Sequence, residues 1–271
     1  MSVRDSRGGD PSIFAMGGGG FTMEPENAAL DDFVLSLTDR PEPRVLFLPT
    51  ASGDPTAQIT AFYARFARRA SAAHLSLFRR HGSARSLADI VLEQDLIYVG
   101  GGSMRNLLAI WRAHELDALL AEAWRRGIVL AGLSAGAMCW FAGGVTRSGG
   151  PLEVIDGLGL LPGSFTVHAD GEPERLPVWL AAVRDGALPG GWAADDGVGL
   201  LFRGTRMVRV VTSRPGTAAL RVDAVGDELV RHRIEPELLG ADPSRPPSPA
   251  SLPVPDDVRE LRELRQAMRR G

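Results

Sequence analysis

Ser134 lies at the centre of the stretch Gly132-Leu133-Ser134-Ala135-Gly136, with a glycine two residues before it and another two residues after it. The apolar run at 128–131 predicts a buried strand before this stretch, and small and apolar residues at helical spacing predict a helix after it. A serine between a strand and a helix, flanked by such glycines, is typical of a nucleophile elbow. We therefore interpret Ser134 as a nucleophile; the alternative is an ordinary glycine-rich turn.

A serine nucleophile needs a base within hydrogen-bond reach and N–H donors aimed at the developing oxyanion. Of the five histidines, His168 is the natural base, because it follows the serine in the chain and ends a short extended run at 165–168. The alternative is a structural histidine. The backbone N–H of Ala135 is the expected first oxyanion donor. Gly101 or Gly102, on a neighbouring glycine-rich loop, is expected to supply the second.

The acid that would orient the imidazole is open from the residues alone. Adjacent Asp195 and Asp196 are attractive, because two acids inside an otherwise apolar, strand-like run need a reason to be there. The alternative is a strand-end pair that faces solvent. The full set of acids compatible with the sequence is Glu153, Asp156, Asp170, Glu172, Asp195 and Asp196.

Short apolar runs alternate with helical patterns through the first half of the chain. This order predicts an α/β fold with a parallel sheet and right-handed crossovers, in which ligand sites lie beyond the carboxyl ends of the strands. The glycine-rich or turn-prone segments 17–20, 50–54 and 100–103 and Ser134 would gather on that edge. The strands are expected at 13–16, 44–49, 74–78, 95–99 and 128–131, and the helices at 26–37, 56–70, 105–111 and 115–126.

The four consecutive glycines at 17–20 allow either a close backbone approach or a phosphate-binding turn. They lack the G-x-G-x-x-G spacing and a helix directly behind them, so a dinucleotide site is weakly supported. After the elbow, we expect a glycine-rich loop at 143–150, a helix at 175–183, and a late pair of strands at 192–202 and 207–212.

The domain boundaries follow changes in composition. Residues 1–11 are expected to be a disordered leader, and 12–232 the catalytic domain. The proline-rich run 233–255 is typical of a linker, and 256–271 of a charged helix with apolar residues on one side.

Composition narrows the function classes. The chain has 271 residues and a net charge of −3, which gives no reason to expect nucleic acid or an anionic membrane as partner. All 30 basic residues are arginine, which excludes Schiff-base lysines, a Walker lysine and a Ser-Lys dyad. The single cysteine, Cys139, excludes an intrachain disulfide and a cysteine metal site. Without a signal-like or membrane-length apolar run, we expect a cytoplasmic enzyme.

Seven short motifs, in order along the chain, resemble those of peptidase family S51, the peptidase E and cyanophycinase group. They are AMGGGGF at 15–21, FLPTAS at 47–52, YVGGG at 98–102, GLSAGA at 132–137, GLGLLPG at 157–163, HADGEP at 168–173 and DDG at 195–197. The resemblance implies a three-layer α/β/α sandwich of the flavodoxin-like, class I glutamine-amidotransferase-like kind with a mostly parallel central sheet. It also implies a serine hydrolase without cofactor or metal, with Ser134 as nucleophile, His168 as base and the 100–102 loop at the oxyanion.

Two motifs depart from the family pattern. The glycine loop continues with Ser103-Met104 where Asn-Thr is usual, and Thr146-Arg147-Ser148 stands where many relatives carry an aspartate. The triad acid of those relatives therefore cannot be carried over, and the resemblance implies Asp195 or Asp196 instead, which match an acidic site in a more distant branch of the family. Arg147 could recognise a substrate carboxylate by a bidentate pair, or be a solvated surface arginine. The candidate substrate-binding residues are Ser103, Arg147, Asp170 and Glu172.

The leading hypothesis is a serine peptidase that hydrolyses short peptides, dipeptidase- or tripeptidase-like, through a Ser-His nucleophilic mechanism with a backbone oxyanion hole. One alternative is a catalytically impaired family member that binds a small ligand in the same cleft. Another is a cyanophycinase-like or other non-peptidase hydrolase. A short peptide is the expected partner, nucleic acid and membrane are not, and a homodimer is left open.

Overall fold

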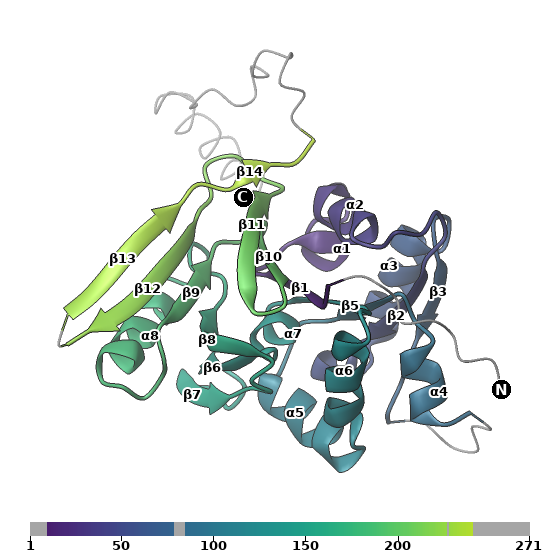
Figure 1. Cartoon of the computed structure of the whole chain (residues 1–271), viewed down its shortest axis with the longest axis horizontal. Coiled ribbons are helices and arrows are strands. Elements are labelled where there is room, and N and C mark those ends of the chain that lie inside the picture. Colours follow the sequence, from purple (N-terminus) through teal and green to yellow (C-terminus); the bar gives the residue numbers. More distant parts are fainter. Residues whose placement is uncertain (1–9, 79–84, 227, 241–271) are drawn as a thin grey trace, which may run out of the picture. The chain divides into compact units, whose positions relative to one another are not determined.

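The computed structural model describes residues 10–78, 85–226 and 228–240, which form two β-sheets with flanking helices (Figure 1). One compact unit ends at Leu239, and the chain from Gly240 onwards is a separate unit, of which only Gly240 is described. The strands of the eight-stranded first sheet, in chain order, are β1 (Ser12–Met16), β2 (Arg44–Leu48), β3 (Ser71–His74), β4 (Leu96–Val99), β5 (Val129–Leu133), β10 (Val198–Arg203), β11 (Arg206–Thr212) and β14 (Glu237–Leu238).

The centre of the first sheet is parallel. Strands β1, β5, β4, β2 and β3 run side by side in the same direction, and β10 and β11 extend the sheet in antiparallel pairing beyond β1. The predicted α/β architecture with a mostly parallel sheet is confirmed. The helices of the compact unit are α1 (Gly20–Met23), α2 (Ala29–Ser36), α3 (Thr56–Phe66), α4 (Leu87–Leu92), α5 (Met104–Ala113), α6 (Leu116–Arg125), α7 (Ala135–Met138) and α8 (Arg175–Arg184), with a 3₁₀ turn at Thr50–Ser52.

Both faces of β1, β2, β4 and β5 are buried, which is why these strands are mostly apolar rather than alternating. Along β1, Phe14 and Met16 pack into the cluster that contains the apolar side chains of α1, α2 and α3. The intervening Ile13 and Ala15 pack into the opposite cluster, with α4, α5 and α6. The helices thus cover the two faces of the sheet (Figure 1).

A second, six-stranded sheet follows the elbow in the chain and was not expected from the sequence. Its order is β13-β12-β9-β8-β6-β7, and α8 packs against it through the buried Trp179. The prediction of a loop at 143–150 is wrong for its first half, because Gly143 and Gly144 lie in a strand of this sheet. The strands are β6 (Phe141–Thr146), β7 (Glu153–Asp156), β8 (Leu161–Thr166), β9 (Gly191–Ala194), β12 (Ala219–Val225) and β13 (Glu228–Ile234).

The sequence predicts one continuous strand at 192–202, but the structure has two strands there, and the acidic pair lies between them. Strand β9 belongs to the second sheet and β10 to the first, so the chain crosses between sheets at Asp195, Asp196 and Gly197. Gly197 adopts φ +81°, a left-handed conformation that glycine tolerates and that turns the chain at this point. Asp196 therefore lies at the junction of the two sheets.

Several predicted boundaries of strands, helices and the catalytic domain differ from those in the structure. The third strand is Ser71–His74 rather than 74–78, because Ala72 and Ala73 pair with Val45 and Leu46 of β2. The expected helix at 26–37 begins at Ala29. The expected end of the catalytic domain at 232 falls inside β13, and the compact unit continues through β14. Residues 1–9 of the expected leader, 241–255 of the expected linker and the expected helix at 256–271 lie outside the described residues.

No helix in the described parts of the chain is both long and apolar enough to cross a membrane.

A charged cluster is buried beneath the first helices. The Asp31 side chain is fully buried, 3.2 Å from Arg65 Nε and 3.5 Å from the Tyr98 hydroxyl, which donates to it. Burial raises the pKa of Asp31 to about 7, and the neighbouring Arg65 guanidinium only partly opposes this. The folded protein thus holds a proton on Asp31 at pH values where the unfolded chain has released it.

We expect Asp31→Asn to flatten the pH dependence of folding stability. Between the unfolded pKa of 3.8 and about 7, only the folded state binds this proton, so the stability of the wild-type protein falls as pH rises through that window. From pH 5 to pH 8, the stability of the variant relative to wild type should increase by roughly 2 to 3 kcal/mol. Urea unfolding of both proteins at the two pH values measures this. An unchanged difference between them would contradict the prediction.

Candidate active site

Ser134 occupies a sharp turn between β5 and α7. Its φ of 53° is unusual for a residue with a side chain, and its N–H donates to Met16 O at 3.0 Å. The neighbouring glycines are required by space: a Cβ on Gly132 would collide with Gly136 O, and a Cβ on Gly136 would lie 2.5 Å from Val99 O. The local sequence therefore produces an elbow that holds the serine hydroxyl out from the end of β5.

His168 meets this hydroxyl from the second sheet. The residue follows β8 and adopts φ 53°, and its Nε2 lies 2.9 Å from Ser134 Oγ. Its Nδ1 lies 2.5 Å from Asp196 Oδ1. The His168 and Asp196 side chains are each only 14% exposed, so water competes little for these hydrogen bonds. Three residues from three separate segments thus form one chain of hydrogen bonds.

The structure separates the two adjacent acids. Asp196 contacts the imidazole, whereas the carboxylate of Asp195 accepts a hydrogen bond from Ala218 N–H at 2.8 Å. Burial raises the pKa of Asp195, which the hydrogen bond from Ala218 opposes. Asp170 accepts from Asp196 N–H at 2.8 Å and so holds the backbone that carries the acid.

The remaining candidate acids have other partners or positions. Glu153 pairs with Arg105, and Glu172 forms a two-pronged pair with Arg175. Asp156 ends β7, where its backbone pairs with Gly143. Of the six acids left open by the sequence, Asp196 is the one whose side chain is hydrogen-bonded to the His168 imidazole in the described structure.

The glycine loop after β4 lies against the elbow. A Cβ on Gly101 would sit 3.2 Å from Ser134 Cβ, so the loop backbone runs directly beside the serine. Gly102 has φ +141°, and a Cβ there would collide with Ala51 O. Ala135 opens α7, where first-turn N–H groups have no acceptor within the helix. The loop and the helix start thus bring backbone donors to the side of Ser134.

A cavity of about 340 Å³ opens beside the serine. The candidate residues Ser103, Arg147 and Glu172 all line it, while Asp170 does not and lies with Asp196 instead. The full lining is Gly102, Ser103, Ser134, Met138, Thr146, Arg147, Ser148, Glu172 and Arg175.

Arg175 is a site residue that the sequence reasoning missed. It is 5% exposed, and its guanidinium donates to both oxygens of Glu172 and to Val145 O. Arg175 begins a predicted helix, and nothing in the local sequence indicates that it lines the cavity. Glu172 also lies 3.7 Å from Arg147 Nε, so two guanidinium groups share this one carboxylate in the cavity lining. Arg147 pairs with Glu174, whose side chain is 74% exposed.

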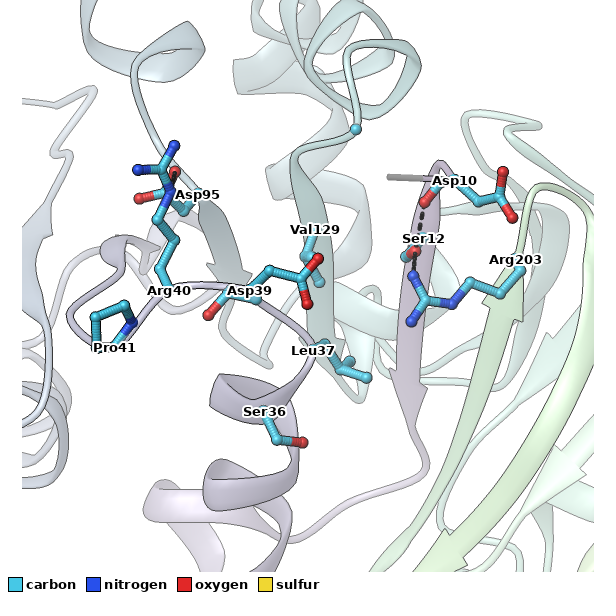
Figure 2. Close-up of a pocket in the computed structure, with 12 residues that line it drawn as sticks. Asp10, Ser12, Ser36, Leu37, Asp39, Arg40, Pro41, Asp95, Val129 and Arg203 are labelled. Carbon is cyan, nitrogen blue, oxygen red and sulfur yellow. Dashed lines mark hydrogen bonds and ion pairs between the residues drawn. The ribbon is translucent and has the colours of Figure 1, made fainter. Parts of the chain in front are cut away.

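A larger cavity, of about 610 Å³, lies at the opposite edge of the first sheet, where β1 and β5 begin (Figure 2). Figure 2 shows Arg203 beside Ser12, to whose hydroxyl it donates at 2.6 Å, and Arg40 beside Asp95. None of the described residues that line it is a histidine, so it holds no serine–histidine pair. This cavity is larger than the one beside Ser134, but the nucleophile geometry is at the other edge.

Within the described residues, no group of three histidine, cysteine or acidic side chains is placed to hold a metal ion.

The chain is similar to a known protein family. A model of peptidase family S51 matches residues 13–210. The chain is 46% identical over 229 residues to the uncharacterized peptidase YgaJ of Bacillus subtilis (strain 168), covering 84% of this chain and 99% of that protein.

Two solved structures share the fold. One is a peptidase from an acI-B1 Actinobacterium, with a TM-score of 0.64 and 20% identity, covering 82% of this chain and 94% of that one. The other is a putative peptidase E protein from Listeria monocytogenes EGD-e, with a TM-score of 0.55 and 18% identity, covering 75% of this chain and 98% of that one.

Proposed function

The chain belongs to peptidase family S51 and is a serine-type peptidase, and we propose that it hydrolyses short peptides through Ser134, His168 and Asp196. The observation that carries this proposal is the continuous chain of hydrogen bonds from Ser134 Oγ through the imidazole to the Asp196 carboxylate. A serine, a base in reach of it and an acid that orients the base are together the arrangement required for nucleophilic attack on an acyl carbon.

In the proposed reaction, His168 Nε2 takes the proton of Ser134 Oγ as that oxygen attacks the peptide carbonyl carbon. The C–N bond then breaks, and His168 gives the proton to the leaving amine. Water, deprotonated by the same nitrogen, then attacks the acyl-enzyme. The bond from the acyl carbon to Ser134 Oγ breaks, and His168 returns the proton to that oxygen as the acid is released. Asp196 holds the proton of His168 on Nδ1, which leaves Nε2 free to accept, and stabilises the imidazolium that forms.

The oxyanion of each tetrahedral intermediate would be held by backbone donors. The N–H of Ala135 follows the nucleophile directly and opens α7. Gly101 or Gly102 would supply the second donor, because their loop passes beside Ser134 without side chains. One such donor is worth about 10²- to 10³-fold in kcat in serine peptidases.

The size of the cavity favours short substrates. A volume of about 340 Å³ is at the lower end of the range for small-molecule pockets, enough for one or two peptide residues beside Ser134. Its net charge is positive, because Arg147 and Arg175 line it with one acid, Glu172. Arg175 is fully engaged, whereas Arg147 holds an exposed pair with Glu174 at 2.7 Å and a longer, partly exposed pair with Glu172 at 3.7 Å, and pairs of this kind contribute little.

We therefore propose that Arg147 binds a carboxylate of the peptide near the scissile bond. The test is a panel of dipeptides and tripeptides in matched pairs, in which one member carries a carboxylate and the other the corresponding amide. The carboxylate member of each pair should have the higher kcat/KM. Arg147→Ala should lower that preference about tenfold, mainly through KM, because a guanidinium binds a carboxylate in the ground state and the transition state alike.

Arg105→Ala is the matched control, since Arg105 is also exposed and paired with a glutamate but does not line the cavity. It should leave the preference unchanged. Hydrolysis of the panel with no preference for carboxylates would contradict the role of Arg147 alone. A panel without any hydrolysed peptide would contradict the proposed activity and favour a ligand-binding or non-peptidase role.

A further inference from the structure

The four glycines at 17–20 connect β1 to α1 and take no part in the steps above. The sequence left open a phosphate-binding turn or a close backbone approach at this loop. The helix behind the loop has four residues, too short to provide an anion site. Gly18 is instead packed against side chains of the reaction centre, which favours the close backbone approach.

Gly18 touches both partners of the acid–base pair. A Cβ on Gly18 would overlap Asp196 Oδ1, lie 2.9 Å from Asp196 Cγ and lie 3.0 Å from His168 Nδ1. Gly18 does not have a left-handed φ, so its backbone conformation is open to any residue. Glycine is required here by space and not by conformation.

The loop and the acid are also joined through their backbones. Gly17 N–H donates to Val198 O at 2.9 Å, and Gly197 N–H donates to Gly18 O at 3.3 Å. These bonds bracket Asp196 from the side of the first sheet. From the other side, Asp170 accepts from Asp196 N–H, and a Cβ on Gly171 would lie 3.2 Å from Asp196 Oδ2. The carboxylate is thus enclosed between two segments, with no room for a methyl group on the side of Gly18.

We propose that Gly18 is a positioning residue for the hydrolysis: its missing side chain is the space in which the Asp196 carboxylate reaches His168 Nδ1. This inference rests on the proposed function of Asp196 and adds a residue far from it in the chain. Any side chain at position 18 would push the carboxylate away from the imidazole, and it would crowd His168 Nδ1 less severely.

Gly18→Ala should lower kcat about 10²- to 10⁴-fold with KM changed less than about threefold, because displacement of a catalytic group by about 1 Å has effects of this size and the peptide cavity is untouched. In a double-mutant cycle, Gly18→Ala combined with Asp196→Asn should be no slower than Asp196→Asn alone. Gly186→Ala is the control for a general loss of stability: a Cβ there meets nothing within 4 Å, but the left-handed φ of +73° strains alanine, so stability should fall while kcat stays unchanged.

The outcomes separate the two proposals. If Asp196→Asn retains full activity, the proposed role of the acid fails. If Asp196→Asn is slow while Gly18→Ala is fast, or if the two losses multiply, the inference about Gly18 is overturned. Should Gly18→Ala not fold, Gly18→Ala with Asp196→Ala is the decisive variant, since removing the carboxylate removes the overlap. Folding of that double variant supports the inference, and its failure to fold overturns it.

Discussion

Replacement of Ser134 with alanine is expected to lower kcat for peptide hydrolysis by about 10⁵- to 10⁶-fold, to the residual rate that binding and the oxyanion donors alone provide. Ser134 Oγ is the atom that His168 Nε2 contacts, at 2.9 Å, and alanine leaves the imidazole with nothing to deprotonate. His168→Ala should be about as slow, and the double variant no slower than either, because the two residues act as a unit.

The nucleophile can also be identified without a known substrate. A fluorophosphonate should add one adduct mass to the wild-type protein, on Ser134, and none to Ser134→Ala. Ser103→Ala is the matched control: Ser103 lines the same cavity, but its hydroxyl accepts from Asn106 N–H at the start of α5. That variant should be labelled normally and keep kcat within about tenfold, with about 1 kcal/mol of lost capping stability. Hydrolysis by Ser134→Ala at the wild-type rate would exclude the mechanism.

The second large effect is expected from the acid. Asp196→Asn should lower kcat about 10⁴-fold, because an amide donor facing Nδ1 favours the tautomer whose proton sits on Nε2, the nitrogen that must accept the proton of Ser134. KM should change little, since Asp196 does not line the peptide cavity. Steady-state kinetics on the best peptide of the panel measure both quantities.

Asp195→Asn is the adjacent and nearly isosteric control. The Asp195 carboxylate accepts from Ala218 N–H, and an amide oxygen can accept the same hydrogen bond. We expect less than a tenfold change in kcat. Equal losses in the two variants would show that the pair acts through local structure and not through contact of Asp196 with His168.

These two acids also show where the chain departs from the relatives it resembles. Where the resemblance places an aspartate in many family members, this chain carries Arg147, which lines the cavity beside Ser134. The acid that contacts His168 comes instead from the crossing between β9 and β10. An arginine at position 147 is thus compatible with hydrogen bonds from the serine through the histidine to an acid, because the acid, Asp196, comes from a separate segment.

The features that the sequence predicted correctly are those encoded in short stretches. Apolar runs bounded by turn residues marked β1, β2, β4 and β5, since a strand buried on both faces needs apolar side chains throughout. The elbow was equally local, because the collision of a Cβ on Gly132 with Gly136 O depends on residues four apart. The sequence by itself therefore determined the parallel sheet, the position of Ser134 and the edge on which it lies.

The second sheet could not be predicted because its pairings are distant and its strands lack a strong pattern. Gly143 and Gly144 suggest a loop, yet a Cβ on Gly144 would collide with Phe165 O, so glycine there allows β6 to lie closely against β8. The hairpin of β12 and β13 is largely polar on its exposed face and gave no apolar run.

The acid was decided only by the tertiary structure. Asp195 and Asp196 are indistinguishable by composition and spacing, but neighbouring side chains on an extended chain point to opposite sides. Which of them meets His168 depends on where the chain leaves β9 and enters β10, and on the room that Gly18 provides from the other end of the domain sequence. A serine on a tight turn is a local property, whereas its orienting acid requires two sheets and a loop to be brought together.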